Sequence, residues 1–186
     1  MKSSSALLPR FGPILAAMAL AGCQTRAYPP LQLADSVDTP RYMGAWYVIA
    51  CIPSFIERNE FNAVESYRLD PDGRIRTVFT YNQGSFDGPA KRLTPVGFVT
   101  AGSHGTIWGM RFIWPIKADY RVMYVAADYS QTVVGREKRD YAWIMARAPT
   151  MPPTDLQRLT ALLAGQGYDI GRLRLVPQQR RAVTEP

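Results

Sequence analysis

The side chains that most often carry out catalysis are scarce in this sequence of 186 residues. It contains one histidine, His104, and two cysteines, Cys23 and Cys51. This supply excludes most histidine-based catalysis, a cysteine-rich zinc site and a scaffold held by many disulfides. His104 lies in a Gly-Ser-His-Gly stretch that is typical of a solvated turn. The sequence therefore predicts no enzyme, no cofactor and no metal site.

Cys23 has a different chemistry because of the residues that precede it. Residues 11–21 are almost wholly apolar, and the only charges before them are those of Lys2 and Arg10. This apolar run of 11 residues is too short to span a bilayer as a helix, and together with the basic start it predicts a signal peptide over residues 1–22. The four residues that end at Cys23, Leu-Ala-Gly-Cys, resemble the bacterial lipobox. That resemblance implies cleavage before Cys23 and acylation of its thiol and new amine.

An acylated Cys23 would hold the mature chain on a membrane, because each buried methylene contributes about 0.8 kcal/mol. By analogy with lipoprotein sorting, Gln24 in place of Asp after the cysteine indicates the bacterial outer membrane. Residues 23–40 contain three prolines and little periodicity, so we expect a lipidated tether before a domain over residues 41–178. Residues 179–186 are expected to form a polar tail.

Strand patterns with turn signals between them fill residues 44–148, which predicts an all-β domain. Turns such as Pro71-Asp72-Gly73 separate short stretches in which apolar and polar residues alternate. Such a series of hairpins is typical of an up-and-down barrel or a sandwich. The predicted strands are residues 45–51, 61–69, 74–81, 91–100, 106–113, 119–126, 131–135 and 141–147.

One helix is expected after the strands. Leu156, Leu159, Leu162 and Leu163 fall on one helical face, preceded by two prolines and followed by Gly165 and Gly167. We expect this face to pack on the strands rather than in a membrane. Residues 172–176 alternate in hydrophobicity and predict a short ninth strand.

Several motifs resemble those of the lipocalins, and most closely those of the bacterial lipocalins related to apolipoprotein D. The similarity covers about residues 38–178. Gly44 and Trp46 match the Gly-x-Trp-Tyr signature of the first strand, and Arg147 ends the eighth strand, where lipocalins place an arginine over that tryptophan. Asp128 and Tyr129 match most of a Thr-Asp-Tyr motif, although Ala127 replaces its threonine. Further matching segments are 44–50, 67–73, 139–147 and 167–169.

The resemblance implies an eight-stranded antiparallel up-and-down barrel with one C-terminal helix packed outside it. Such a barrel has enough interior for one small ligand. Strand parity predicts which side chains point inward. The expected cavity lining is bulky and apolar and suits an acyl chain: Phe79, Tyr81, Trp108, Met110, Phe112, Tyr141, Trp143 and Met145.

Glu65 falls on the inward face of its predicted strand, where a carboxylate is costly to bury. We expect a one-residue bulge to turn it outward, with contact to a polar ligand headgroup as the alternative. The open end of the barrel should be formed by residues 52–60, 82–90, 114–118 and 136–140. Apolar residues in these connections, such as Phe55, Ile56, Trp114 and Ile116, suggest contact with a membrane or ligand as readily as packing within the loops.

The function that follows is a non-enzymatic carrier of a fatty acid or lysophospholipid at the outer membrane. The alternatives are a haem or pigment binder and, less favoured, an enzyme with a lipocalin fold. Loss of the signal peptide lowers the net charge from +7 to +5, and no dense basic patch predicts nucleic-acid binding. Acylation of Cys23 would leave no second cysteine with which Cys51 could form a disulfide. Cys51 is therefore expected to be a small buried residue at a strand end. The sequence leaves a homodimer open.

The lipobox reading makes a direct prediction for Cys23→Ser. The variant should lose acylation and membrane attachment while the domain still folds, since the site precedes every predicted strand. Membrane fractionation with acyl labelling is the measurement. Acylation that persists in the variant would contradict the assignment of Cys23.

Overall fold

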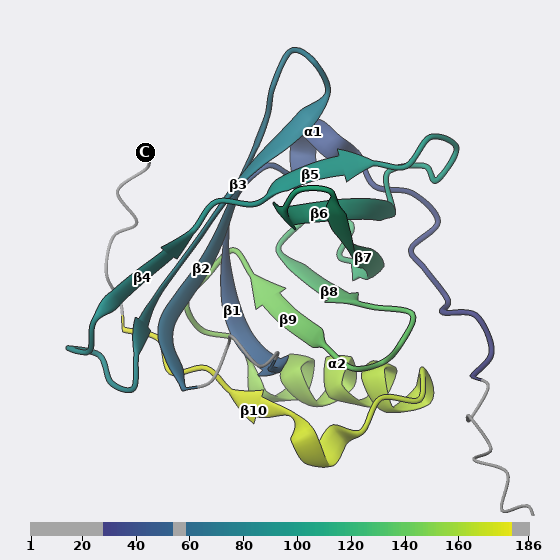
Figure 1. Ribbon diagram of the computed structural model, residues 1–186. Coiled ribbons are helices and arrows are strands. Elements are labelled where there is room, and N and C mark those ends of the chain that lie inside the picture. The colour runs from purple at the N-terminus through teal and green to yellow at the C-terminus, as the bar shows by residue number, and fades with distance from the viewer. Residues whose placement is uncertain (1–27, 54–58, 180–186) are drawn as a thin grey trace, which may run out of the picture.

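The computed structural model describes residues 28–53 and 59–179, and its main element is one antiparallel sheet that curves into a barrel (Figure 1). The strands are β1 (Gly44–Ile52), β2 (Glu60–Leu69), β3 (Arg74–Gln83), β4 (Ala90–Leu93), β5 (Val96–Val99), β6 (Ile107–Ile113), β7 (Ile116–Val125), β8 (Gln131–Gly135), β9 (Ala142–Ala146) and β10 (Arg174–Leu175). The helices are α1 (Thr39–Tyr42) and α2 (Pro153–Gly165), with a 3₁₀ turn, η1, at Ile170–Arg172.

From β1 to β9, each strand is hydrogen-bonded to the next in the order of the sheet. Hydrogen bonds between β1 and β9 then close this sheet into a barrel. The fourth predicted strand is split into β4 and β5, both paired with β3. The split falls at Pro95, which lacks a backbone N–H, and whose carbonyl accepts a hydrogen bond from Thr77 N at 3.1 Å. Counted as one interrupted strand, β4 and β5 give the eight-stranded barrel that the sequence predicts.

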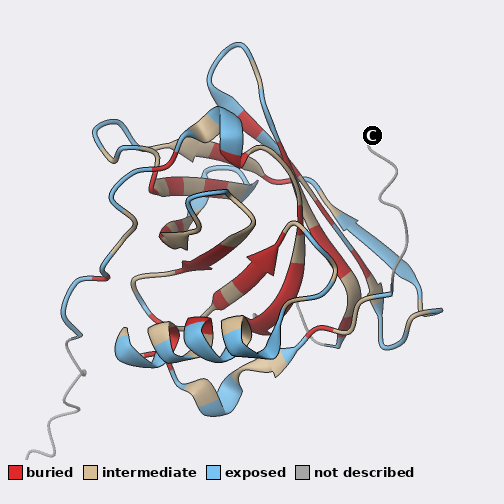
Figure 2. Ribbon diagram, turned by 180° about the vertical axis from the view of Figure 1, so that it is seen from behind, coloured by how far each residue is buried: buried red, intermediate tan, exposed pale blue. Residues whose placement is uncertain are grey.

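The alternation of side chains along the strands builds the core inside the barrel. In β3, Ile75, Thr77, Phe79 and Tyr81 are buried while their neighbours are more exposed, as a period of two requires. Figure 2 shows the same alternation of buried and exposed residues on other strands. Cys51 is buried near the end of β1, as expected.

Helix α2 packs on the outside of the barrel, under β9 and β1 (Figures 1 and 2). Leu159 and Leu163 are fully buried there in a second hydrophobic cluster with Ile52 and Ile144. The leucine stripe is therefore a packing face, as predicted. The short ninth strand is also present as β10, which pairs with β1.

The segment before the barrel differs from the expected tether in its described part. Residues 28–38 lie against the barrel, with Leu31 and Val37 buried and the N–H of Val37 bonded to the carbonyl of His104 at 2.8 Å. The one-turn helix α1 follows, and the carboxylate of Asp38 caps it by accepting a hydrogen bond from Arg41 N at 3.1 Å. Sparse apolar residues among prolines gave no periodic signal for this packing.

Helix α1 closes one end of the barrel together with residues from the first and last barrel strands. The indole N–H of Trp46 donates to the carbonyl of Tyr42 at 2.8 Å, and both side chains are fully buried. The guanidinium of Arg147 lies 3.8 Å from the centre of the Trp46 ring. It also donates to the carbonyls of Arg41, Tyr42, Met43 and Ala45. Arg147 thus connects the end of β9 to α1 and the start of β1.

Trp46→Ala should lower the free energy of unfolding by about 3–5 kcal/mol, because it empties a fully buried site and removes the surface on which Arg147 stacks. Trp114→Ala is a matched control, since that side chain is 79% exposed; it should cost less than about 0.5 kcal/mol. Chemical denaturation of both variants is the measurement. A loss below about 1 kcal/mol for Trp46→Ala would show that this end does not depend on the indole.

Candidate functional site

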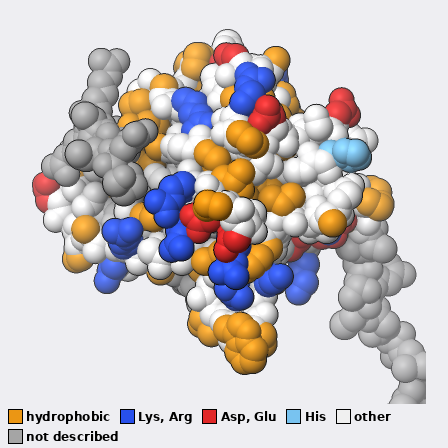
Figure 3. Space-filling view, turned by 90° about the horizontal axis from the view of Figure 1, so that it is seen from above, with side chains coloured by type: hydrophobic (Ala, Val, Ile, Leu, Met, Phe, Trp, Pro, Cys, Tyr) orange, Lys and Arg blue, Asp and Glu red, His pale blue; other side chains and the backbone are white. Residues whose placement is uncertain are grey.

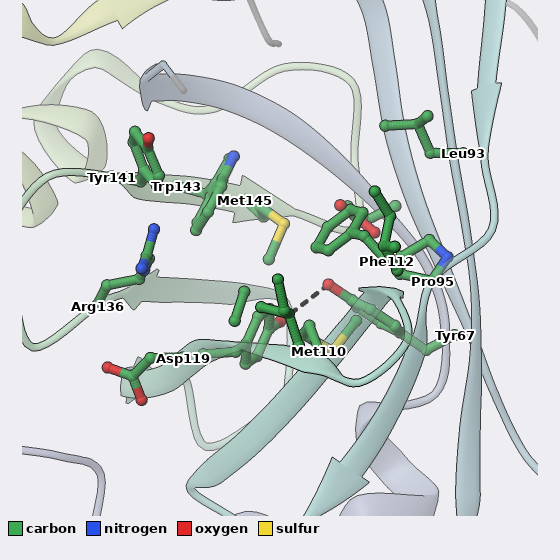
Figure 4. Close-up of a pocket in the computed structure, with 15 residues that line it drawn as sticks. Tyr67, Leu93, Pro95, Met110, Phe112, Asp119, Arg136, Tyr141, Trp143 and Met145 are labelled. Atoms are coloured by element: carbon green, nitrogen blue, oxygen red, sulfur yellow. Dashed lines mark hydrogen bonds between the residues drawn. The ribbon is translucent and has the colours of Figure 1, made fainter. Parts of the chain in front are cut away.

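A cavity of about 430 Å³ lies inside the barrel and opens at the end opposite α1. This volume is within the usual range for small-ligand pockets. Its walls come from β2, β6, β7 and β9, from the segment between β3 and β6, and from the turn after β8 (Figure 4). The lining residues are Glu65, Tyr67, Leu93, Pro95, Met110, Phe112, Ile113, Ile116, Ala118, Asp119, Tyr120, Arg136, Tyr141, Trp143 and Met145.

Six of the nine residues predicted to bind ligand line this cavity. They are Glu65, Met110, Phe112, Tyr141, Trp143 and Met145. Strand parity places them on the inner face of the barrel. Their contact with a ligand stays a prediction.

Phe79, Tyr81 and Trp108 are buried inside the barrel but do not line the cavity. The rings of Phe79 and Tyr81 pack on each other with centroids 5.2 Å apart. Trp108 fills the closed end, stacked 4.8 Å from Tyr120, and its indole N–H donates to the carbonyl of Gly105 at 2.7 Å. Parity gives the face of a strand, but the height along the barrel and the packing of neighbours decide which inward side chains meet empty space.

The lining from β7 was missed because the connection before it is shorter than the predicted residues 114–118. Strand β7 already begins at Ile116, and Ile113 pairs with Ile116 across the turn at Trp114 and Pro115. Ile116, Ala118 and Tyr120 alternate into the cavity, and this alternation is visible in the sequence once Pro115 is placed in a tight turn. Residues 54–58 of the first connection, which include Phe55 and Ile56, lie outside the described residues.

Glu65 faces the cavity, contrary to the expected outward orientation. Strand β2 does contain an irregularity, but it lies between Phe61 and Val64, before Glu65. After it, Ala63, Glu65 and Tyr67 share the inner face. Glu65 pairs in register with Trp46 of β1, so its carboxylate lies on the wall toward the closed end.

Tyr67 and Tyr120 form the cavity floor, and a chain of buried hydroxyl groups continues behind them. The hydroxyl oxygens of Tyr67 and Tyr120 are 2.9 Å apart, those of Tyr120 and Tyr42 are 3.2 Å apart, and Tyr42 lies 3.1 Å from Thr132 Oγ1. Thr132 donates its proton to the carbonyl of Tyr124 at 2.8 Å. Because each hydroxyl has one proton, Tyr42 donates to Thr132, Tyr120 to Tyr42 and Tyr67 to Tyr120. The protons along this chain point away from the cavity.

Burial disfavours ionisation of Tyr42 and Tyr120. It raises the pKa of Tyr42 to about 12, against the opposing effect of its hydrogen bonds to Thr132 and Tyr120. Burial likewise raises the pKa of the Tyr120 hydroxyl well above its usual value. A floor of neutral tyrosines beside the Glu65 carboxylate offers hydrogen-bond acceptors rather than positive charge to a ligand.

The polar groups at the cavity mouth have the opposite character. Arg136 is the one cation among the described lining residues. Its guanidinium lies 4.8 Å from the Tyr141 ring centre and forms an ion pair with Asp140 at 3.3 Å. Its Nε is buried and has no hydrogen-bond partner among the described residues. The neighbouring Asp119 is already engaged, since it pairs with Arg121 at 3.0 Å and accepts from Glu137 N at 2.8 Å.

Comparison with known proteins agrees with this architecture. The family model of the lipocalin-like domain matches residues 37–178. The chain belongs to the lipocalin family. Lipocalins bind small hydrophobic ligands in the barrel, and the cavity described above occupies that position.

The chain is similar to relatives from plants, bacteria and animals. It is 30% identical to temperature-induced lipocalin-1 of Arabidopsis thaliana over 80% of this chain and 83% of that protein. It is 26% identical to the outer membrane lipoprotein Blc of Escherichia coli over 92% and 97%, and 25% identical to apolipoprotein D of Mus musculus over 81% and 80%.

Solved structures show the same fold. Insecticyanin from the tobacco hornworm Manduca sexta aligns with a TM-score of 0.64 at 13% identity, over 83% of this chain and 87% of that one. Lobster apocrustacyanin A1 aligns with a TM-score of 0.58 at 17% identity, over 82% and 91%.

The family motif residues lie at the closed end of this lipocalin. Gly44 has a φ of 92°, and a Cβ there would lie 3.2 Å from Nη1 of Arg147. The carboxylate of Asp128 accepts hydrogen bonds from the backbone and side chain of Ser130, and the hydroxyl of Tyr129 accepts one from Asp38 N at 2.8 Å. These contacts tie the β7–β8 turn to α1, away from the cavity.

Two further observations concern the described residues alone. They contain no group of three or more His, Cys, Asp or Glu side chains arranged to hold a metal ion. No helix among them is both long and apolar enough to cross a membrane. Cys23 lies outside the described residues.

Proposed function

We propose that the protein is a non-enzymatic carrier of a single-chain lipid, a fatty acid or lysophospholipid, at the bacterial outer membrane. The observation that carries the proposal is the polarity of the cavity along its length. Apolar side chains, among them Met110, Met145 and Trp143, line its middle, and the charged Arg136 lies at the mouth. One acyl chain with one anionic or polar headgroup matches this arrangement.

The floor supports one orientation of such a ligand. The floor hydroxyl protons are donated along the chain from Tyr67 toward Thr132, and the Glu65 carboxylate lies on the nearby wall. A carboxylate or phosphate placed there would face acceptor oxygens and a like charge, which is costly in a buried site. The acyl chain therefore enters first, and the headgroup stays at the mouth near Nε of Arg136.

The proposed location rests on the N-terminal motif and on the bacterial relatives. Cys23 ends the lipobox-like sequence, and the similar Blc proteins are named outer membrane lipoproteins. A carrier anchored in this way would bind lipids released from the membrane or in transit to it. Such a role supports membrane maintenance without chemistry on the ligand.

Affinity should rise with acyl-chain length, by about fourfold per methylene at about 0.8 kcal/mol each, until the cavity is full. Trp143→Glu should abolish most of this binding, because it places a carboxylate against hydrocarbon. Lys117→Ala is the control, since Lys117 is exposed and outside the cavity lining. Titration of fatty acids of increasing length, followed by tryptophan fluorescence, is the measurement. Equal affinity at all lengths, or normal binding by folded Trp143→Glu, would contradict the cavity assignment.

Arg136→Gln tests the headgroup position separately. It should weaken fatty-acid binding about fivefold, or ~1 kcal/mol, because a partly solvated ion pair is lost. A fatty alcohol of the same length should bind the variant and the native protein equally. Calorimetric titration with both ligands is the measurement. A loss of the same size for the alcohol, or none for the acid, would place the carboxylate elsewhere.

A further inference from the structure

The β6–β7 hairpin ends in an apolar tip that stays largely exposed, although part of it borders the cavity. The apolar tip consists of Phe112, Ile113, Trp114 and Ile116, which are 53%, 74%, 79% and 71% exposed. Four of the seven large hydrophobic side chains exposed in the described residues are therefore gathered within five consecutive positions. Exposed clusters of this kind mark a contact surface, whereas single exposed apolar residues do not.

Two cations lie just behind the apolar tip. The guanidinium of Arg111 is 4.7 Å and Lys117 Nζ is 4.2 Å from the ring centre of Phe98, so both charges lie on one outer face of the hairpin. At about 3.3 Å per strand residue, Arg111 lies about 10 Å behind Trp114. Figure 3 shows a knob of hydrophobic side chains projecting from the molecule with Lys and Arg side chains behind it.

The apolar tip also borders the cavity mouth. Phe112, Ile113 and Ile116 contribute to the cavity lining as well as to the exposed surface. Whatever covers the tip therefore adjoins the opening through which a ligand enters.

We propose that the apolar tip inserts into the interfacial region of an anionic lipid bilayer. Membrane-surface segments bury their apolar face about 5–10 Å deep, and cations near the surface are attracted to anionic lipids. These are the depth and charge pattern of the tip with Arg111 and Lys117 behind it. Insertion sets the cavity mouth against the bilayer. The contact does not depend on which ligand the cavity takes.

A lipid surface fits the apolar tip better than a second copy of this chain. A stable protein interface uses about 20–30 residues on each side, far more than the four of the tip. A symmetric contact between two tips would also bring Arg111 and Lys117 of both copies together, in a chain whose net charge is already positive.

Trp114 allows the contact to be measured in the full chain, even when an N-terminal anchor holds the protein on the vesicle. Trp46 and Trp108 are buried and Trp143 lines the cavity, so Trp114 is the exposed tryptophan of the described residues. The probe is a vesicle of phosphatidylcholine and phosphatidylglycerol with brominated acyl chains, which quench indole on contact. We expect a blue shift and quenching that disappear in Trp114→Phe, since this variant retains the signal of the other tryptophans.

A pair of charge variants tests the role of the cations. Arg111→Ala with Lys117→Ala should reduce the Trp114 quenching, whereas Arg68→Ala with Arg74→Ala, near the turn between β2 and β3, removes the same charge and should leave it unchanged. Circular dichroism checks that each variant folds. Equal quenching in both double variants would show that Arg111 and Lys117 are not attracted to the lipid headgroups.

Three results would overturn insertion itself. One is a chain that floats with the vesicles while Trp114 stays unquenched. Another is a chain that does not associate with the vesicles at all. The third is a Trp114 blue shift that grows with protein concentration in the absence of vesicles, which would assign the tip to a second copy. Fatty-acid titration without vesicles measures the cavity independently, so failure of the tip proposal is distinguishable from failure of the carrier proposal.

Discussion

The stacking of Arg147 on Trp46 joins the two ends of the barrel sheet at the point where the chain closes it. Pairing of β1 with β9 makes a cylinder, but a cylinder alone has two openings. Arg147 extends from the end of β9 to four carbonyl groups in residues 41–45 and holds α1 across one opening. Tyr42 of α1 is thereby fixed inside the barrel, where its hydroxyl lies between those of Tyr120 on the cavity floor and Thr132 behind it. The single open end follows from this closure.

The polarity of the cavity follows from the same end of the molecule. Because Thr132 donates to a backbone carbonyl, the direction of every proton from Tyr42 to Tyr67 is determined. The floor therefore accepts hydrogen bonds, and a cation is found at the mouth, where Arg136 lies in the β8–β9 turn. Under the proposed function, a gradient of this kind would orient a lipid while binding its headgroup weakly, which suits a carrier that must also release its ligand.

Local patterns predicted the parts of the fold that depend on them. Alternation identified the inner face of β3, a leucine stripe identified α2, and the pairing of Trp46 with Arg147 followed from the family resemblance. Tight packing could not be predicted in the same way. Phe79 and Trp108 point inward as expected, yet their neighbours fill the space around them, and parity carries no information about this.

Other features were not predicted, because their sequence patterns are more typical of a different local structure. Pro115 favoured a long loop, although the chain turns within two residues and β7 starts at once. The connection 136–140 was expected at the open end, but Arg136 was not among the expected lining residues, because a charged turn is typical of solvated surface. Leu31 and Val37 are too widely spaced among polar residues and prolines to predict a packed segment.

We infer that the cavity holds one acyl chain with its headgroup at the mouth. The most direct test is a crystal structure of the protein with a fatty acid that carries bromine on its terminal carbon, located by anomalous scattering. We expect one bromine peak near the floor, among Tyr67, Met110, Tyr120 and Met145, and carboxylate density beside Arg136. A bromine peak at the mouth, or a cavity that stays without bromine at saturating ligand, would contradict it.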